Sequence, residues 1–130
     1  KISNEKKYKN ISLSKPILLL SGGETTVKVL GNGRGGRNTE LMLSMAINLN
    51  KARNISALAV DTDGIDGIED NAGAYISHET LNKAVFKKVN PQTYLDNNDS
   101  YSFFKKINDL IFTSPTLTNV NDFRAVLINP

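Results

Sequence analysis

The stretch TTVKVLGNGRGGRNTELMLSMAINL, residues 25–49, decides the fold together with the stretch ISALAV, residues 55–60. Residues 25–30 alternate and are rich in β-branched side chains, which predicts a strand. Residues 38–49 repeat apolar side chains at helical spacing, and residues 55–60 form a continuous apolar run that is typical of a strand buried on both faces. A helix between two strands predicts a βαβ unit and therefore an α/β fold.

The flanking segments complete a small sheet. Residues 17–20 predict a strand that can pair with residues 25–30 as a hairpin, and residues 110–113 and 123–128 are expected to be the closing strands. Further helices are expected over residues 77–88, from Pro91 onward, and over residues 100–108. Because a hairpin and a closing pair argue against a purely parallel sheet, we expect a single α/β domain with a mixed β-sheet flanked by helices.

The domain boundaries follow from composition. Residues 1–15 are polar and rich in Lys and Asn, which predicts an N-terminal arm or linker, whereas residues 16–130 carry the predicted elements. A chain of 130 residues suits one compact domain. The first residue is Lys1 rather than Met, and no signal-peptide pattern follows it. We therefore expect this chain to be a fragment of a larger protein.

Composition excludes several classes of function. The net charge of +3 does not argue for nucleic-acid binding, for which a stripe of Lys and Arg is expected, and it is compatible with an anionic small ligand. No apolar run approaches the roughly 20 residues of a membrane span. The chain has no cysteine, which excludes disulfides, thiolate metal sites and a cysteine nucleophile, and which fits a cytoplasmic location.

The loop GNGRGGRN, residues 31–38, is the first candidate site. It lies between a predicted strand and a predicted helix, where glycines allow positive φ and close ligand approach and the helix start offers free N–H groups. Arg34 and Arg37 add charge that suits phosphate or carboxylate, so Gly33, Gly35, Gly36 and Asn38 become candidate phosphate-binding residues. The alternative is a glycine-rich turn whose arginines are solvated or paired with acidic neighbours.

The same glycines fit a second reading. Gly31, Gly33 and Gly36 match the dinucleotide-binding pattern G-x-G-x-x-G, and Asp61 follows the next predicted strand. The motif alone is weak, and two arginines would crowd a loop that normally contacts pyrophosphate through its backbone. NAD(P) binding is therefore kept as the alternative.

The loop DTDGIDGIED, residues 61–70, is the second candidate site. Ligand sites in open α/β sheets gather at the carboxyl ends of strands, where carboxylates can hold Mg²⁺ or accept a hydroxyl proton. Asp63 and Asp66, with Thr62 and Gly64, are the candidates. A loop of Asx turns is the alternative.

The loop TSPTLTNVND, residues 113–122, is the third candidate site. Its small donors and acceptors can bind a hydroxylated or carboxylated ligand, and they can equally cap their own backbone. Thr116, Asn119, Asn121 and Asp122 are the candidate ligand contacts. The single histidine, His78, lies near a helix start without a nucleophile elbow, and we interpret it as a surface residue.

The three loops and one further motif resemble the MOFRL domain of class II glycerate 2-kinases. That family carries, in order, the segments G-x-G-R-G-G-R-N-x-E, T-D-G-x-D-G, N-D-S-Y-x-F-F and T-N-V-N-D-x-R. This sequence has them at residues 31–40, 62–67, 98–104 and 118–124. The resemblance covers nearly everything from Ser21 to Ile128.

The resemblance implies a kinase that transfers the γ-phosphoryl group of ATP to D-glycerate with Mg²⁺ and gives 2-phosphoglycerate. It implies a cleft shared with a larger N-terminal Rossmann-like domain of the same polypeptide, so that this fragment alone is expected to be inactive. Arg34, Arg37, Asp63 and Asp66 become the candidate catalytic residues. Some members of the family are called hydroxypyruvate reductase, the enzyme version of the NAD(P) alternative, and a non-catalytic binding module is the third hypothesis.

Two departures from the family pattern fall in the third loop. Where the family has T-G-P-T-G-T-N, this chain has Ser114 and Leu117 in place of the two glycines. If those glycines serve positive φ or close ligand approach, this loop is expected to differ in shape. A further departure lies outside this loop, where Thr39 stands in place of the usual Gln.

Overall fold

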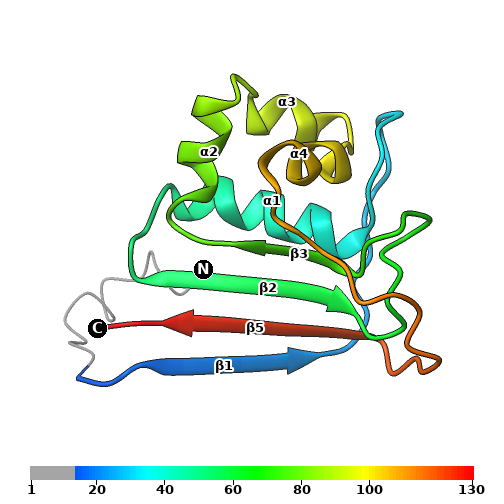
Figure 1. The fold of residues 1–130 in the computed structure, drawn as a ribbon, viewed down its shortest axis with the longest axis horizontal. Helices are drawn as coiled ribbons and strands as arrows, with labels where there is room; N and C mark the ends of the chain where they lie inside the picture. The colour runs from blue at the N-terminus through cyan, green and yellow to red at the C-terminus, as the bar shows by residue number, and fades with distance from the viewer. Residues whose placement is uncertain (1–13) are drawn as a thin grey trace.

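The computed structural model describes residues 14–130, so most of the predicted arm at 1–15 lies outside the described residues. Five strands form one sheet in the order β1-β5-β2-β3-β4 (Figure 1). Their bounds are Ile17–Gly22 for β1, Ile55–Asp61 for β2, Gly73–Ile76 for β3, Leu110–Ile111 for β4 and Asp122–Ile128 for β5. The single α/β domain with a sheet flanked by helices is thereby confirmed.

The sheet is antiparallel rather than mixed. All four strand pairs among the described residues are antiparallel, and β5 lies between β1 and β2. The closing strands β4 and β5 therefore do not pair with each other, because β4 extends the opposite edge next to β3. The helix α1, Arg37–Leu49, connects β1 to β2, which run parallel to each other but are separated by β5 and are therefore not paired neighbours.

The predicted strand at residues 25–30 is wrong, and so is its hairpin with β1. Residues 23–30 are not in a strand. Side chains elsewhere satisfy several of their backbone donors: the N–H of Thr25 bonds Asp122, and those of Leu30 and Gly31 bond the side-chain oxygen of Asn98. Alternation of β-branched residues favours an extended backbone, but it does not indicate which strand, if any, the segment pairs with.

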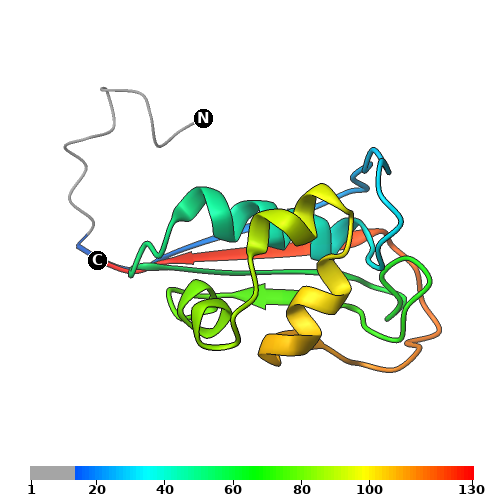
Figure 2. The ribbon, with the colours of Figure 1, turned by 90° about the horizontal axis from the view of Figure 1, so that it is seen from above.

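Helices α2 (Thr80–Phe86), α3 (Pro91–Asp96) and α4 (Ser100–Ile107) confirm the three remaining helix predictions. Asn90 caps α3 by accepting hydrogen bonds from the N–H groups of Gln92 and Thr93. Figures 1 and 2 show the helices gathered around the β2–β3 side of the sheet, leaving β5 and β1 without a covering helix. None of the described helices is long and apolar enough to cross a membrane.

The core lies between α1, α4 and the β2–β3 part of the sheet. Met42, Leu43 and Ala46 of α1 pack with Ala57 and Ala59 of β2, whose small side chains allow close approach. Phe103, Phe104 and Ile107 of α4 face inward as predicted. Strand β2 is fully buried only at alternate positions, not on both faces, because no described element covers its other face.

Candidate functional site

The three candidate loops meet at one end of the sheet, at the right of Figure 1. Strands β1 and β2 end there, and β5 and α1 begin there. Register brings the last residue of β2, Asp61, opposite the first residue of β5, Asp122. Two carboxylates from distant parts of the chain therefore lie next to the start of α1.

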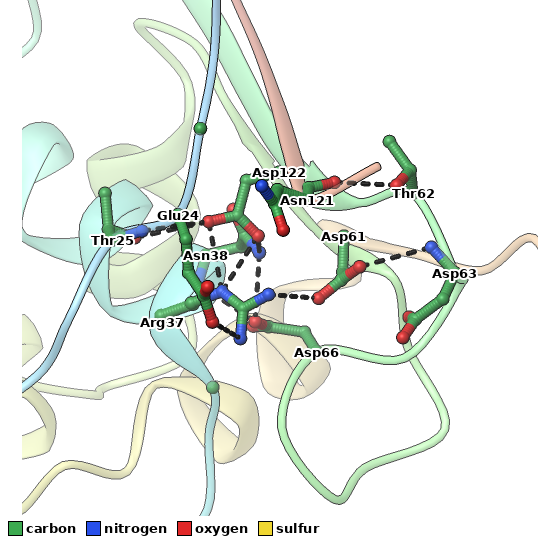
Figure 3. A network of polar contacts seen from close by, with 12 residues as sticks. Glu24, Thr25, Arg37, Asn38, Asp61, Thr62, Asp63, Asp66, Asn121 and Asp122 are labelled. Atoms are coloured by element: carbon green, nitrogen blue, oxygen red, sulfur yellow. Dashed lines mark hydrogen bonds and ion pairs between the residues drawn. The ribbon is translucent and has the colours of Figure 1, made fainter. Parts of the chain in front are cut away.

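Arg37 lies at the centre of this end of the sheet (Figure 3). Its Nε donates to both carboxylate oxygens of Asp122 at 2.9 and 3.0 Å, and its Nη2 donates to Asp61 at 2.5 Å. Its Nη1 lies 3.6 Å from Glu24 in a looser ion pair, and the Glu24 side chain is 60% exposed. Arg37 is thus fixed on two sides by buried carboxylates and held only weakly on the third.

The pKa values of the two buried carboxyl groups are shifted in opposite directions. Burial by itself raises the pKa of Asp122, but hydrogen bonds from Asn38 and Arg37 outweigh it, so the pKa lies below its ordinary value. Burial raises the pKa of Asp61, and the charge of Arg37 offsets only part of this. Burial works against the charge of Arg37, yet the bonds to Asp122 and Asp61 outweigh it and raise the pKa of the guanidinium. Arg37 therefore stays charged.

Asp66, a predicted catalytic residue, is fully buried and caps the start of α1 from a distant loop. One carboxylate oxygen accepts from the backbone N–H and the amide of Asn38, and the other accepts from the backbone N–H and hydroxyl of Thr39. The N–H groups that the sequence offered to an anionic ligand are thus bonded to a carboxylate of the chain itself. The same Asn38 amide also donates to Asp122, which couples the cap to the Arg37 cluster.

The glycine loop packs against the chain. None of its four glycines has positive φ. A Cβ at Gly31 would lie 2.2 Å from the backbone oxygen of Asn97, one at Gly33 would lie 2.4 Å from Asp99, and one at Gly35 would lie 2.3 Å from the hydroxyl oxygen of Ser100. The free space beside these glycines is filled by residues 97–100, the region of the fourth motif.

Arg34 is engaged outside the Arg37 cluster. Its guanidinium bonds both carboxylate oxygens of Glu69, at 2.9 and 2.5 Å, and lies 4.6 Å from the ring centre of Tyr101. The hydrogen bond to Glu69 raises the pKa of Arg34. Glu69 is buried while Arg34 remains largely exposed. The two predicted catalytic arginines thus belong to separate ion pairs.

The dinucleotide-binding alternative lacks its structural setting. That motif requires a strand, the glycine turn and a helix in a parallel βαβ unit. Here no strand leads directly into Gly31, because residues 23–30 after β1 are not in a strand, and the described strand pairs are antiparallel. The match to G-x-G-x-x-G is therefore a coincidence of spacing in a loop packed against other backbone.

The second and third loops bind each other. The hydroxyl of Thr62 donates to the carbonyl of Asn121, and the amide of Asn119 donates to Asp63. The hydroxyl of Thr116 donates to the carbonyl of Thr62. Gly64 has positive φ, and a Cβ there would lie 2.3 Å from the carbonyl oxygen of Ser114. Asp63, Thr62, Asn119 and Asn121 thus share one partly exposed surface beside Arg37.

The positions that depart from the family's glycines keep a glycine-like backbone. Ser114 has φ of 62° and Leu117 has φ of 60°. A changed loop shape was expected if these two positions required positive φ. Both residues adopt the left-handed conformation although neither is glycine. The side chain of Leu117 is almost completely exposed.

Sequence reasoning did not single out Glu24 or Thr25, the residues from β1's end that contact Arg37 and Asp122. Glu24 follows two glycines after an apolar strand, and this was the signal available for it. The described residues form no set of three or more His, Cys, Asp or Glu placed to hold a metal ion. Every oxygen of Asp61 and Asp122 already accepts a hydrogen bond.

Residues 17–122 match the MOFRL family. This chain belongs to the MOFRL family. It is 46% identical over 127 residues to a D-glycerate 2-kinase of Thermotoga maritima, covering 98% of this chain and 30% of that protein. A crystal structure described as glycerate kinase from the same organism superimposes with a TM-score of 0.87, covering 94% of this chain and 30% of that one.

A protein of Agrobacterium vitis named putative hydroxypyruvate reductase is 50% identical over 122 residues, covering 92% of this chain and 28% of that protein. The chain therefore spans about a third of the length of these relatives.

Proposed function

We propose that this chain is the C-terminal domain of an ATP-dependent D-glycerate 2-kinase. The whole polypeptide would transfer the γ-phosphoryl group of ATP to the 2-hydroxyl of D-glycerate and form 2-phosphoglycerate and ADP. The bond from phosphorus to ADP breaks, the bond to the glycerate oxygen forms, and the hydroxyl proton leaves. The similarity to enzymes named glycerate kinase supports this activity over the reductase, whose nucleotide-binding setting is absent from the described residues.

The observation that carries the proposal for this site is the geometry of Arg37. Asp122 and Asp61 fix two sides of the guanidinium, whereas Nη1 faces only the exposed Glu24 at 3.6 Å. An incoming carboxylate or phosphate oxygen can replace Glu24 there without disturbing the buried bonds. Phosphoryl transfer needs mainly positioning and charge neutralisation, and a guanidinium that is already held in place loses little freedom on binding.

The charge of the cluster sets a requirement for the rest of the polypeptide. Glu24, Asp61 and Asp122 pair with Arg37, and Arg124 lies 4.0 Å from Asp122, so three ionised carboxylates against two guanidinium groups leave the cluster net negative. We assign the further positive charge that ATP and glycerate need to residues outside this domain. Asp63 is joined to the cluster by its backbone N–H, which donates to Asp61, and its side chain accepts from the exposed Asn119; these two side chains are the groups we assign to orienting a substrate hydroxyl.

Arg34, Asp66 and the glycines take other roles in this proposal. Arg34 pairs with the buried carboxylate of Glu69. Asp66 fixes Asn38 and Thr39 at the start of α1, and the glycines allow close packing. Mg²⁺, which the family resemblance implies, finds no ligand set of its own among the described residues. No step is therefore assigned to a metal held by this domain.

The test is ADP formation by the polypeptide that carries this chain, with and without D-glycerate. Turnover should require D-glycerate. Arg37→Lys should lower kcat/KM by about 10- to 100-fold, because losing a charge-assisted contact to the substrate costs about 1.5–3 kcal/mol. Glu24→Gln should lower the KM for the substrate that binds Nη1, because it removes the competing carboxylate.

Arg53→Lys is the matched control, since Arg53 lies at the opposite end of β2 beside His78. It should leave kcat/KM unchanged. Oxidation of NADH with hydroxypyruvate, in the absence of any use of ATP, would establish the reductase instead. A polypeptide with neither activity would favour the binding module.

A further inference from the structure

The sheet has a second face that no described helix covers. Register places its side chains in rows that run across the strands: Leu18–Leu127–Ser56, then Leu20–Ala125–Leu58–Tyr75, then Gly22–Phe123–Val60–Gly73. The alternate residues, such as Ala57 and Ala59, point to the buried side beneath α1. We call these three rows the open face.

The open face is apolar and uncharged. None of its residues is Asp, Glu, Lys or Arg, although 22% of the chain is charged. The side chains of β1 and β5 are nevertheless accessible: Leu18 is 58% exposed, Leu20 is 60% exposed and Phe123 is 41% exposed. A shallow groove of about 430 Å³ runs between Leu18, Leu58 and Tyr75. Contiguous apolar surface of this kind marks an interface rather than a solvated face.

Strand β1 adds an open edge to this face. β1 pairs with β5 on one side and with no described strand on the other. Its residues on the α1 side, Ile17 and Leu19, are also exposed, because α1 packs over β2 and β3 instead. An apolar edge strand with both faces uncovered would be prone to aggregation if it stayed in water.

We propose that the open face is the surface on which the remaining two-thirds of a longer polypeptide packs. The solved relative at 46% identity has the same fold over only 30% of its length, so in such proteins most of the chain lies outside this domain. An apolar sheet needs cover on both sides, and the helices of this domain cover one side only, over β2 and β3. The absence of charge fits a permanent contact, since charged residues are depleted in the cores of such interfaces.

This surface differs from the Arg37 cluster. The cluster occupies the loop end of the sheet, whereas the open face consists of one side of strands β1, β5, β2 and β3. Packing on the open face fixes the orientation of the loop end relative to the rest of the polypeptide. The inference does not depend on the proposed kinase activity.

Thiol labelling tests the proposal on the polypeptide that carries this chain. Because the chain has no cysteine, Leu20→Cys and Phe123→Cys each introduce a single thiol into the domain, and peptide mass spectrometry separates it from cysteines elsewhere. Val85→Cys on the outer side of α2 is the matched control, because Val85 is 70% exposed. Each labelling rate is divided by the rate for the same variant in denaturant.

Leu20→Cys and Phe123→Cys should label at least about tenfold more slowly than in denaturant, because access limits thiol reactivity, whereas Val85→Cys should approach its denatured rate. Protection must persist on dilution. Full labelling at positions 20 and 123 would overturn the proposal. Protection that disappears on dilution, together with a dimer in sedimentation, would overturn it in favour of a second copy. ADP formation plays no part in the readout, so failure here leaves the proposed function untouched.

Discussion

Two loops at the same end of the sheet use glycine in opposite ways. The loop at residues 31–36 has four glycines and no positive φ, and each is needed because chain atoms occupy the place of its side chain. The loop at residues 113–121 has no glycine, yet Ser114 and Leu117 take the left-handed conformation. A high glycine content therefore marks close packing in the first loop, and the special backbone lies in the second loop.

The difference bears on where a ligand can bind. The glycine loop is filled by residues 97–100 and by Asp66, so its backbone is already in contact with protein. The loop at residues 113–121 is exposed and forms hydrogen bonds mainly with Thr62 and Asp63. The second loop leaves Asn119 and Asn121 exposed, close to Asp63 and Asp122.

Gly31→Ala should have the largest effect. The added Cβ would lie 2.2 Å from the backbone oxygen of Asn97, and backbone cannot move aside as a flexible side chain does. We expect the free energy of unfolding to fall by about 2–3 kcal/mol, as for other overpacked sites. Gly22→Ala is the control, because the nearest atom to its Cβ is 3.6 Å away. Equal urea midpoints for the two variants would contradict the packing role of Gly31.

Asp66→Ala should have the next largest effect, about 2 kcal/mol, since it uncaps α1 and leaves the buried N–H groups of Asn38 and Thr39 without partners. Gly36 touches the same carboxyl: a Cβ there would lie 2.4 Å from the Asp66 side chain and 2.5 Å from the Asp66 backbone carbon, so removing the carboxyl relieves part of the crowding. Gly36→Ala and Asp66→Ala together should therefore destabilise by less than the sum of the single changes, by at least about 0.5 kcal/mol. Additive losses in urea unfolding would show that Asp66 does not set the space beside Gly36.

Local features of the fold could be predicted from the sequence, whereas long-range contacts could not. Helices α1 and α4 were predictable because their apolar spacing and inward phenylalanines are local signals. The pairing of β1 with β5 was not, since the partner lies about a hundred residues away and alternation alone does not name it. Likewise, Arg37 was recognised by its charge, but its partners arrive from β2, β5 and the end of β1. The sequence motifs indicated which residues form the site, while the antiparallel topology determines which of them form hydrogen bonds with each other.

Leu117→Gly should have the smallest effect and the opposite sign. A non-glycine residue with positive φ is strained by about 1–2 kcal/mol, whereas glycine loses more chain entropy on folding, about 0.5–1 kcal/mol, so a net gain of about 0.5 kcal/mol is expected. Because Leu117 is 98% exposed, its removal sacrifices almost no burial. Thr118→Gly is the control, since Thr118 does not have positive φ and should lose stability. Urea unfolding of the polypeptide that carries this chain measures both. A loss at Leu117 would mean that its side chain packs against a part of the polypeptide outside this domain, and the strained backbone would then serve to present it there.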